Sequence, residues 1–228
     1  MTAMRITALA AILALVAGCT SETEPGPQQE LRAACERHQL TACHDLAMML
    51  ARGDGGKRDF KQARALFAQS CNAGHTESCY RLALFHLQGR GGETNPEMGR
   101  ALYNRACEAG HAQACMELGE LWFYGRSGPK DHKRARSLFE KACELGDDKA
   151  CSQFAGMCLQ GLGGFKRLTT ARKVFVKMCD RGQANACHNL AVMMHEGRGG
   201  KRDRDGAKKL FARACKLGHA DACEEIEP

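Results

Sequence analysis

The stretch that decides the fold is residues 71–115, which read CNAGHTESCYRLALFHLQGRGGETNPEMGRALYNRACEAGHAQAC. It holds two pairs of cysteines with eight residues from the first to the second of each pair, and one pair follows the other by 36 residues. The spacing continues along the chain, with cysteines at 35, 71, 107, 143, 179 and 215 and at 43, 79, 115, 151, 187 and 223. Repetition at a fixed step of this length indicates a solenoid of stacked units.

Aligned at this step, each unit reads as two short helices. The first helix carries apolar residues on one face, as in Leu82 and Phe85, with a small residue such as Ala83 between them. A glycine such as Gly89 follows, and glycine past a helix end supplies a left-handed turn without steric strain. The second helix carries a large apolar pair in every unit: 66–67, 102–103, 138–139, 174–175 and 210–211. Each unit is therefore predicted to be an αα-hairpin.

A capping residue precedes the second helix in most units, namely Asp59, Asn95, Asp131 and Asp203. Such side chains accept hydrogen bonds from the free N–H groups of a helix start. The fourth unit has Arg167 in this column, so we expect its second helix to begin with a weak or shifted cap.

The composition fits a folded protein with an unusual number of cysteines. Hydrophobic residues make up 44% and charged residues 26% of 228, close to a soluble globular average. The formal net charge of +7 is a mild excess that does not by itself imply nucleic acid, and we expect none as a partner. The count of 14 cysteines calls for disulfides, metal sites or both.

The N-terminus has the pattern of a bacterial lipoprotein signal. Arg5 precedes an apolar stretch, 6–17, that is too short for a membrane-spanning helix, and Val-Ala-Gly-Cys at 16–19 resembles a lipobox. The resemblance implies cleavage after Gly18, a lipid on Cys19 and, because Thr20 is not Asp, sorting to the outer membrane. Residues 19–29 then form the lipidated Cys and a flexible tether, with the solenoid in the periplasm or at the cell surface.

The unit pattern Cys-x-x-Leu-Ala/Gly, Gly-x-Gly-Gly, Ala-x-x-Leu-Phe, Ala-Cys-x-x-Gly resembles Sel1-like repeats. More narrowly, it resembles their disulfide-bearing branch, the Helicobacter cysteine-rich proteins. The resemblance implies an all-α, right-handed solenoid related to tetratricopeptide repeats. Its organisation would be a signal peptide at 1–18, a tether at 19–29 and a solenoid at 30–228, made of a capping half-repeat 30–42, repeats 43–78, 79–114, 115–150, 151–186 and 187–222, and a stub 223–228.

The resemblance also implies a disulfide within each cysteine pair: Cys35–Cys43, Cys71–Cys79, Cys107–Cys115, Cys143–Cys151, Cys179–Cys187 and Cys215–Cys223. Counting residues leaves open a pairing across a whole unit, such as Cys43 with Cys71. Cys158 is then left as a free thiol, expected to be a small buried residue, with a reactive thiol as the alternative.

Zinc is the rival use of the cysteines. His75, His111 and His219 each lie midway between two cysteines and could complete a set of soft ligands. The same column holds Asp147 and Gln183 in other units, and no fourth ligand recurs. We therefore predict no metal and no cofactor.

Members of the resembling family are linked to penicillin binding and weak β-lactamase activity, so catalysis is the alternative function. A serine β-lactamase needs Ser-x-x-Lys on one helical turn. The match here is Ser127-Gly128-Pro129-Lys130, where Gly-Pro would break that turn, and we predict no catalytic residue.

The preferred function is a scaffold that binds a protein, a peptide or a cell-wall ligand, acting as a monomer. Solenoids present repeated helices as an extended concave face. The candidate binding face comprises Tyr80, Leu84, Met116, Glu120, Trp122, Phe123 and Tyr124. The last three are consecutive and would form an anchor pocket; the alternative is that they fill the core between repeats. A basic edge along the inter-helix loops, open to anionic lipid or cell-wall polymer, comprises Lys57, Arg58, Lys130, Lys133, Arg134, Lys166, Arg167, Lys201 and Arg202.

Overall fold

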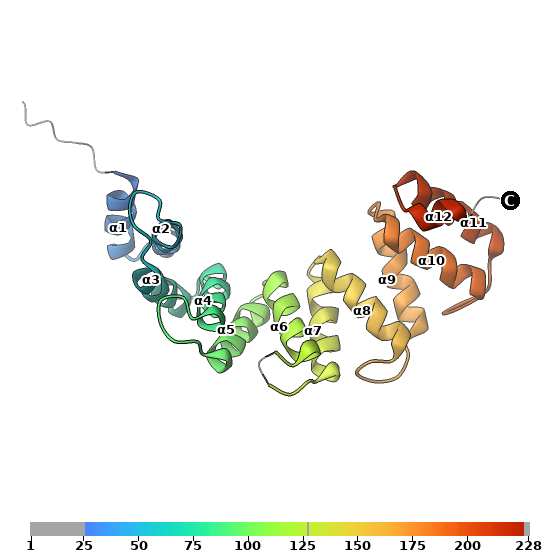
Figure 1. The fold of residues 1–228 in the computed structure, drawn as a ribbon, viewed down its shortest axis with the longest axis horizontal. Coiled ribbons are helices and arrows are strands. Elements are labelled where there is room, and N and C mark those ends of the chain that lie inside the picture. The colour runs from blue at the N-terminus through green and yellow to red at the C-terminus, as the bar shows by residue number, and fades with distance from the viewer. Residues whose placement is uncertain (1–25, 127, 226–228) are drawn as a thin grey trace, which may run out of the picture.

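The computed structural model of the chain describes residues 26–126 and 128–225. This part is all helical, and its helices run in pairs along an elongated, arched row with α1 and α12 at opposite ends (Figure 1). They are α1 (Pro27–Glu36), α2 (Leu40–Arg52), α3 (Phe60–Asn72), α4 (Thr76–Gln88), α5 (Pro96–Glu108), α6 (Ala112–Tyr124), α7 (His132–Glu144), α8 (Asp148–Gln160), α9 (Leu168–Asp180), α10 (Ala184–Glu196), α11 (Arg204–Lys216) and α12 (Ala220–Glu224). The predicted all-α solenoid is confirmed. No helix in the described ranges is long and apolar enough to cross a bilayer.

The glycine and aspartate columns set the helix ends. Each of the even-numbered helices from α2 to α10 stops at a left-handed glycine, as α4 does at Gly89 with φ 67°. The side chains of Asp59, Asn95, Asp131 and Asp203 accept a backbone N–H three residues on at 2.8–2.9 Å. Helix α9 follows Arg167 without a side-chain cap, as the sequence predicted.

The histidines between cysteines cap three of the even-numbered helices, α4, α6 and α12. The Nδ1 atoms of His75, His111 and His219 accept the N–H of Ser78, Ala114 and Ala222 at 3.1–3.3 Å. Asp147 does the same for Ala150 at 2.8 Å. A carboxylate and an imidazole are interchangeable in this role because both offer an acceptor to the helix N-terminus.

The core between helices pairs a large ring with a small residue. The ring of Phe139 in α7 is buried and packs on α6, where a Cβ added at Gly119 would lie 2.6 Å from it. Phe67, Tyr103, Phe175 and Phe211 are buried in the same column. Small residues on one helix therefore let the aromatic of the next approach its backbone.

Disulfides join the end of each odd-numbered helix to the start of the next. The structure contains six in the described residues, with Cα–Cα distances of 4.5–4.7 Å: Cys35–Cys43, Cys71–Cys79, Cys107–Cys115, Cys143–Cys151, Cys179–Cys187 and Cys215–Cys223. The open alternative, Cys43 with Cys71, does not occur in it. Cys158 is free and completely buried, and burial raises the pKa of its thiol.

A column of arginines fixes the loops between helices of one unit. Arg64, Arg136 and Arg172 each donate at 3.2 Å to a backbone carbonyl in the loop of the next unit, on Glu93, Phe165 and Lys201. A glycine of that loop lies directly on the preceding unit, since a Cβ at Gly163 would overlap the carbonyl oxygen of His132. We call Arg64, Arg100, Arg136 and Arg172 the arginine column; they follow one another at intervals of 36 residues.

Acidification is expected to destabilise the N-terminal units through His44. Its Nδ1 lies 2.9 Å from Ser78 Oγ, and burial, with His75 nearby, lowers the pKa of His44 below its usual 6.5. The unfolded chain then binds the extra proton more readily, so stability falls as pH drops below about 6.5 towards the folded pKa. Melting His44→Gln and wild type from pH 7.5 to pH 5 should show a shallower loss in the variant, whereas His38→Gln, at an exposed histidine, should follow wild type. Equal slopes for all three would contradict this role of His44.

Candidate binding site at Trp122

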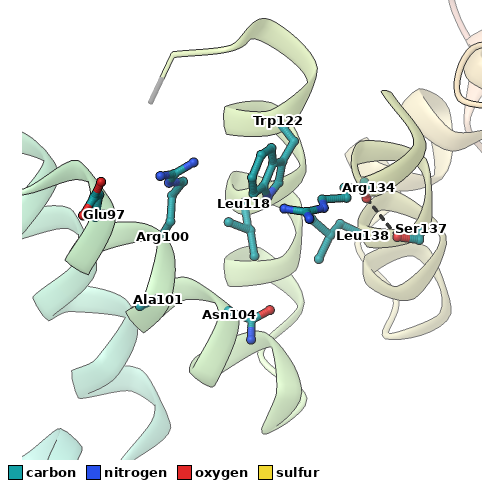
Figure 2. A pocket seen from close by; sticks show the side chains of 9 residues that line it. All are labelled: Glu97, Arg100, Ala101, Asn104, Leu118, Trp122, Arg134, Ser137 and Leu138. Atoms are coloured by element: carbon teal, nitrogen blue, oxygen red, sulfur yellow. Dashed lines mark hydrogen bonds between the residues drawn. The ribbon is translucent and has the colours of Figure 1, made fainter. Parts of the chain in front are cut away.

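An open hollow lies where three helices of successive units meet. It is an open cavity of about 560 Å³ between α5, α6 and α7 (Figure 2). Its lining residues are Glu97, Arg100, Ala101, Asn104, Leu118, Trp122, Arg134, Ser137 and Leu138. Leu118 and Leu138 give it an apolar floor, and the charged side chains stand around the mouth.

Trp122 forms the wall of this cavity and is held between two cations. The guanidinium carbon of Arg100 lies 5.1 Å from the indole centroid, and that of Arg134 lies 4.6 Å from it. Figure 2 shows the two arginines on opposite sides of the ring. Cations at these distances are attracted to the face of an indole, which is the strongest of the aromatic partners. The ring is therefore held in place before any ligand arrives.

Arg100 lies against the loop of the next unit, as the other members of the arginine column do, since a Cβ at Gly128 would lie 2.9 Å from its Nη1. Arg64, Arg136 and Arg172 are engaged by loop carbonyls, whereas Arg100 makes no hydrogen bond to any residue that the structure describes. Arg134, on the other side of the ring, has its Nε 3.3 Å from Asp131 Oδ2. Arg100 thus brings a guanidinium with donor capacity to the cavity.

The repeat places a smaller cavity, of about 270 Å³, at the corresponding position between α7, α8 and α9, so Trp122 is what distinguishes the cavity between α5, α6 and α7. The column of Trp122 holds Leu50, His86, Cys158 and Met194 in the other units, so the indole is special to the third. Apolar floor, aromatic wall and guanidinium donors are what a site needs to take an apolar side chain together with a neighbouring carbonyl or carboxylate.

Of the three consecutive aromatics in the predicted anchor pocket, Trp122 lines the cavity, whereas Phe123 and Tyr124 contact each other edge to face with ring centroids 5.0 Å apart. Phe123 stacks on His132 at 5.1 Å, and Tyr124 is 43% exposed beside Arg126 at 4.8 Å. Neighbouring residues on an α-helix point about 100° apart, so consecutive side chains leave the helix in different directions. Only Trp122 of the three lines the cavity in the described part of the chain.

Met116 is also a correction, because it is completely buried and offers no surface to a ligand. Tyr80 stacks on His111 at 4.7 Å, and burial raises the pKa of its hydroxyl. Glu120 is bound to Lys149 at 2.8 Å, and Leu84 lines a separate cavity of about 300 Å³. The structure therefore does not bring these four residues to the Trp122 cavity.

The remaining predicted sites give no chemistry to build on. Cys19 and Ser127 lie outside the described residues, and Lys130 is exposed in the loop before α7. Among the described residues, no group of three His, Cys, Asp or Glu side chains is placed to hold a metal ion. Nothing in the described geometry supports the β-lactam alternative.

The missed residue is Arg100. The sequence shows an arginine at this position in four units, but without the loop carbonyls opposite them such a pattern indicates only a solvent-exposed face. The stacked hairpins define the class, an α-helical repeat scaffold with cavities between its units.

The particular family follows from the sequence match. A family model described as the Sel1 repeat matches residues 40–75, 76–111, 112–147 and 184–219, and the chain belongs to this family. Sel1 repeats generally mediate protein–protein interactions. Six disulfides are typical of the cysteine-rich repeat proteins and of an oxidising compartment outside the cytoplasm. No curated protein matches the chain.

A solved structure shows the same fold. A Sel1 repeat protein from Oxalobacter formigenes has 23% identity and a TM-score of 0.73, over 86% of this chain and 81% of that one. At this identity the similarity shows the fold alone. Cysteine-rich protein B of Helicobacter pylori has 18% identity and a TM-score of 0.26, over 87% of this chain and 96% of that one.

Proposed function

We propose that this Sel1 scaffold binds a segment of a partner protein, one side chain of which enters the Trp122 cavity. The carrying observation is the indole held between Arg100 and Arg134 at the wall of an open cavity of about 560 Å³. Tryptophan and arginine dominate the binding energy of protein interfaces because they combine large area with few lost rotamers or with multiple hydrogen bonds.

The geometry favours binding over catalysis. The polar side chains that line the cavity can form hydrogen bonds or ion pairs with a ligand, but none of them is paired with another for proton transfer. Arg100 can donate to a carbonyl or carboxylate of the partner while the ligand side chain covers Leu118 and Leu138. Ser137 Oγ is already 2.9 Å from the carbonyl oxygen of Arg134. Because the ring is fixed before binding, little conformational entropy is lost there.

The proposed location is the outer membrane, through a lipid on Cys19. The tether expected at 19–29 ends earlier, because α1 begins at Pro27, so residues 19–26 would connect the lipid to the solenoid. The support is the sequence Val-Ala-Gly-Cys at 16–19 after the apolar stretch 6–17. Several acyl chains anchor a protein stably where one binds reversibly. The solenoid would then meet its partner within reach of the membrane.

A site-specific crosslink tests the cavity. Ala101 lines it, and Ala65 occupies the same column one unit earlier, on α3, outside the cavity. A photo-crosslinking residue placed at 101 in cells should give a defined adduct with one partner protein, and the same residue at 65 should not. Trp122→Ala is expected to reduce the adduct at 101 by about tenfold or more, because loss of a central tryptophan contact removes 2 kcal/mol or more, roughly.

Two further variants keep this result interpretable. Arg100→Gln preserves the packing around the cavity while removing the cation, and should also weaken the adduct. Tyr124→Ala, at an exposed aromatic on the same helix, should leave it unchanged. Identical adducts from 101 and 65, or an adduct indifferent to Trp122→Ala, would rule out the cavity as the binding site.

A further inference from the structure

We propose that the loop between α8 and α9, residues 161–167, docks the solenoid onto an anionic membrane surface. Phe165 at its tip is 93% exposed, and the exposed cations Lys166 and Arg167 follow directly. This proposal concerns a different surface from the Trp122 cavity and does not depend on it.

The backbone of this loop is held while the ring stays free. Arg136 donates from its guanidinium to the carbonyl of Phe165 at 3.2 Å. Gly163, with φ 75°, lies so close to α7 that a Cβ there would overlap the carbonyl oxygen of His132. A phenyl ring on a backbone fixed at both points is presented to solvent without a further ordering cost on binding.

The other units serve as an internal comparison. The column of Phe165 holds Lys57, Glu93, Pro129 and Lys201, so an aromatic stands here in the fourth unit alone of these five. The column of Arg167 holds Asp or Asn in the other four, and α9 begins without the side-chain cap that those residues provide. In the loop 161–167, therefore, a cation stands next to an exposed ring at the position where the other four units have a capping Asp or Asn.

The surroundings extend the positive charge along the same edge. Lys133 follows His132, against which Gly163 packs. Lys201, whose carbonyl accepts a hydrogen bond from Arg172, lies in the loop between α10 and α11. Lys133, Lys166 and Lys201 form no ion pair with a carboxylate that the structure describes. In Figure 1 the α6–α7 and α8–α9 loops both lie along the lower edge of the molecule.

The acids of this edge are already engaged. Asp131 caps α7 and pairs with Arg134, and Asp203 caps α11. Glu140 binds Arg167 through its Oε1 at 3.1 Å. The lysines therefore determine the charge that an approaching surface meets.

An exposed aromatic beside clustered lysines and arginines suits a membrane interface. The ring enters the boundary between headgroups and acyl chains, while the cations attract lipid phosphates. A protein partner would need a shaped pocket for the ring, whereas a fluid interface accepts a protruding side chain without one. Phe165 lines none of the larger cavities found in the described ranges, so the ring stands out from the surface.

Vesicle sedimentation tests the proposal on the chain with Cys19→Ser, which lacks the predicted lipid attachment. This protein should bind vesicles of phosphatidylcholine mixed with phosphatidylglycerol, bind phosphatidylcholine alone far less, and dissociate as salt is raised. Phe165→Ser should reduce the partition coefficient by about tenfold or more. Lys166→Gln should reduce it by about fivefold.

Leu145→Ser is the matched control, because Leu145 is an exposed apolar residue at the turn between α7 and α8, on the other side of the hairpin. It should bind as the parent does, and so should Trp122→Ala, which separates this surface from the cavity. No binding to the anionic vesicles at low salt, or equal binding by Phe165→Ser and its parent, would overturn the proposal. Phe165-dependent capture of an acidic protein without vesicle binding would overturn it too, and would assign the loop to a protein partner.

Discussion

Complete reduction of the six disulfides is expected to unfold the solenoid at ordinary temperature. Each bond closes a short loop between residues 8 apart, which restricts the unfolded chain by roughly 2–3 kcal/mol. The free energy of unfolding of a whole domain is only about 5–15 kcal/mol. Because each hairpin contacts only its neighbours, little other burial replaces what the bonds contribute.

Circular dichroism measures this directly. Protein reduced and then alkylated should lose most of its helical signal, and protein treated with the alkylating agent alone should keep it. The buried thiol of Cys158 should be replaced by serine in both samples, so that disulfide exchange with it plays no part. A reduced and alkylated sample that melts within a few degrees of the oxidised one would show that packing alone holds the fold.

Replacing one ring in the middle of the row should have the next largest effect. Phe139→Ala removes a completely buried ring that fills the space above Gly119, and such a change costs about 3–5 kcal/mol. In a solenoid the damage is local, since the ring packs between neighbouring helices such as α6 and α7. We therefore expect two melting transitions, one for the units before α7 and one for those after it.

Calorimetry distinguishes the two outcomes. Phe165→Ala removes the same side chain from an exposed position and should melt as wild type does, because no buried contact is lost. Phe139→Leu, which retains apolar volume, should fall between the two. A single transition for Phe139→Ala, shifted by no more than a degree or two, would mean that the ring does not couple the units.

Much of the fold could be predicted because the repeat shows each position five times. A glycine at one fixed place in every unit identifies a helix end more reliably than any single glycine does, as Gly89 and its counterparts illustrate. The Asp and Asn caps predicted before α3, α5, α7 and α11 are confirmed in the same way, and so is the missing cap at Arg167.

The site could be predicted only in part because its chemistry lies in departures from the repeat. Trp122 stood out, but grouping it with Phe123 and Tyr124 ignored the rotation between adjacent helical residues. Met116 looked exposed because its unit position lies outside the core stripe, yet tertiary packing buries it. The sequence alone assigned Arg100 no role. Its place in the site became clear only from the structure, where other members of the arginine column donate hydrogen bonds to loop carbonyls.

The arginine column also determines which piece of this chain could be transplanted. The shape of the loop that carries Phe165 is set by Arg136 and His132, which belong to the preceding hairpin. The natural module for grafting into another Sel1 array is therefore residues 132–167, from the start of α7 to the end of that loop, and not the hairpin of α8 and α9. A graft of α8 and α9 alone would carry Phe165 without the contacts from Arg136 and His132 that fix the backbone of its loop.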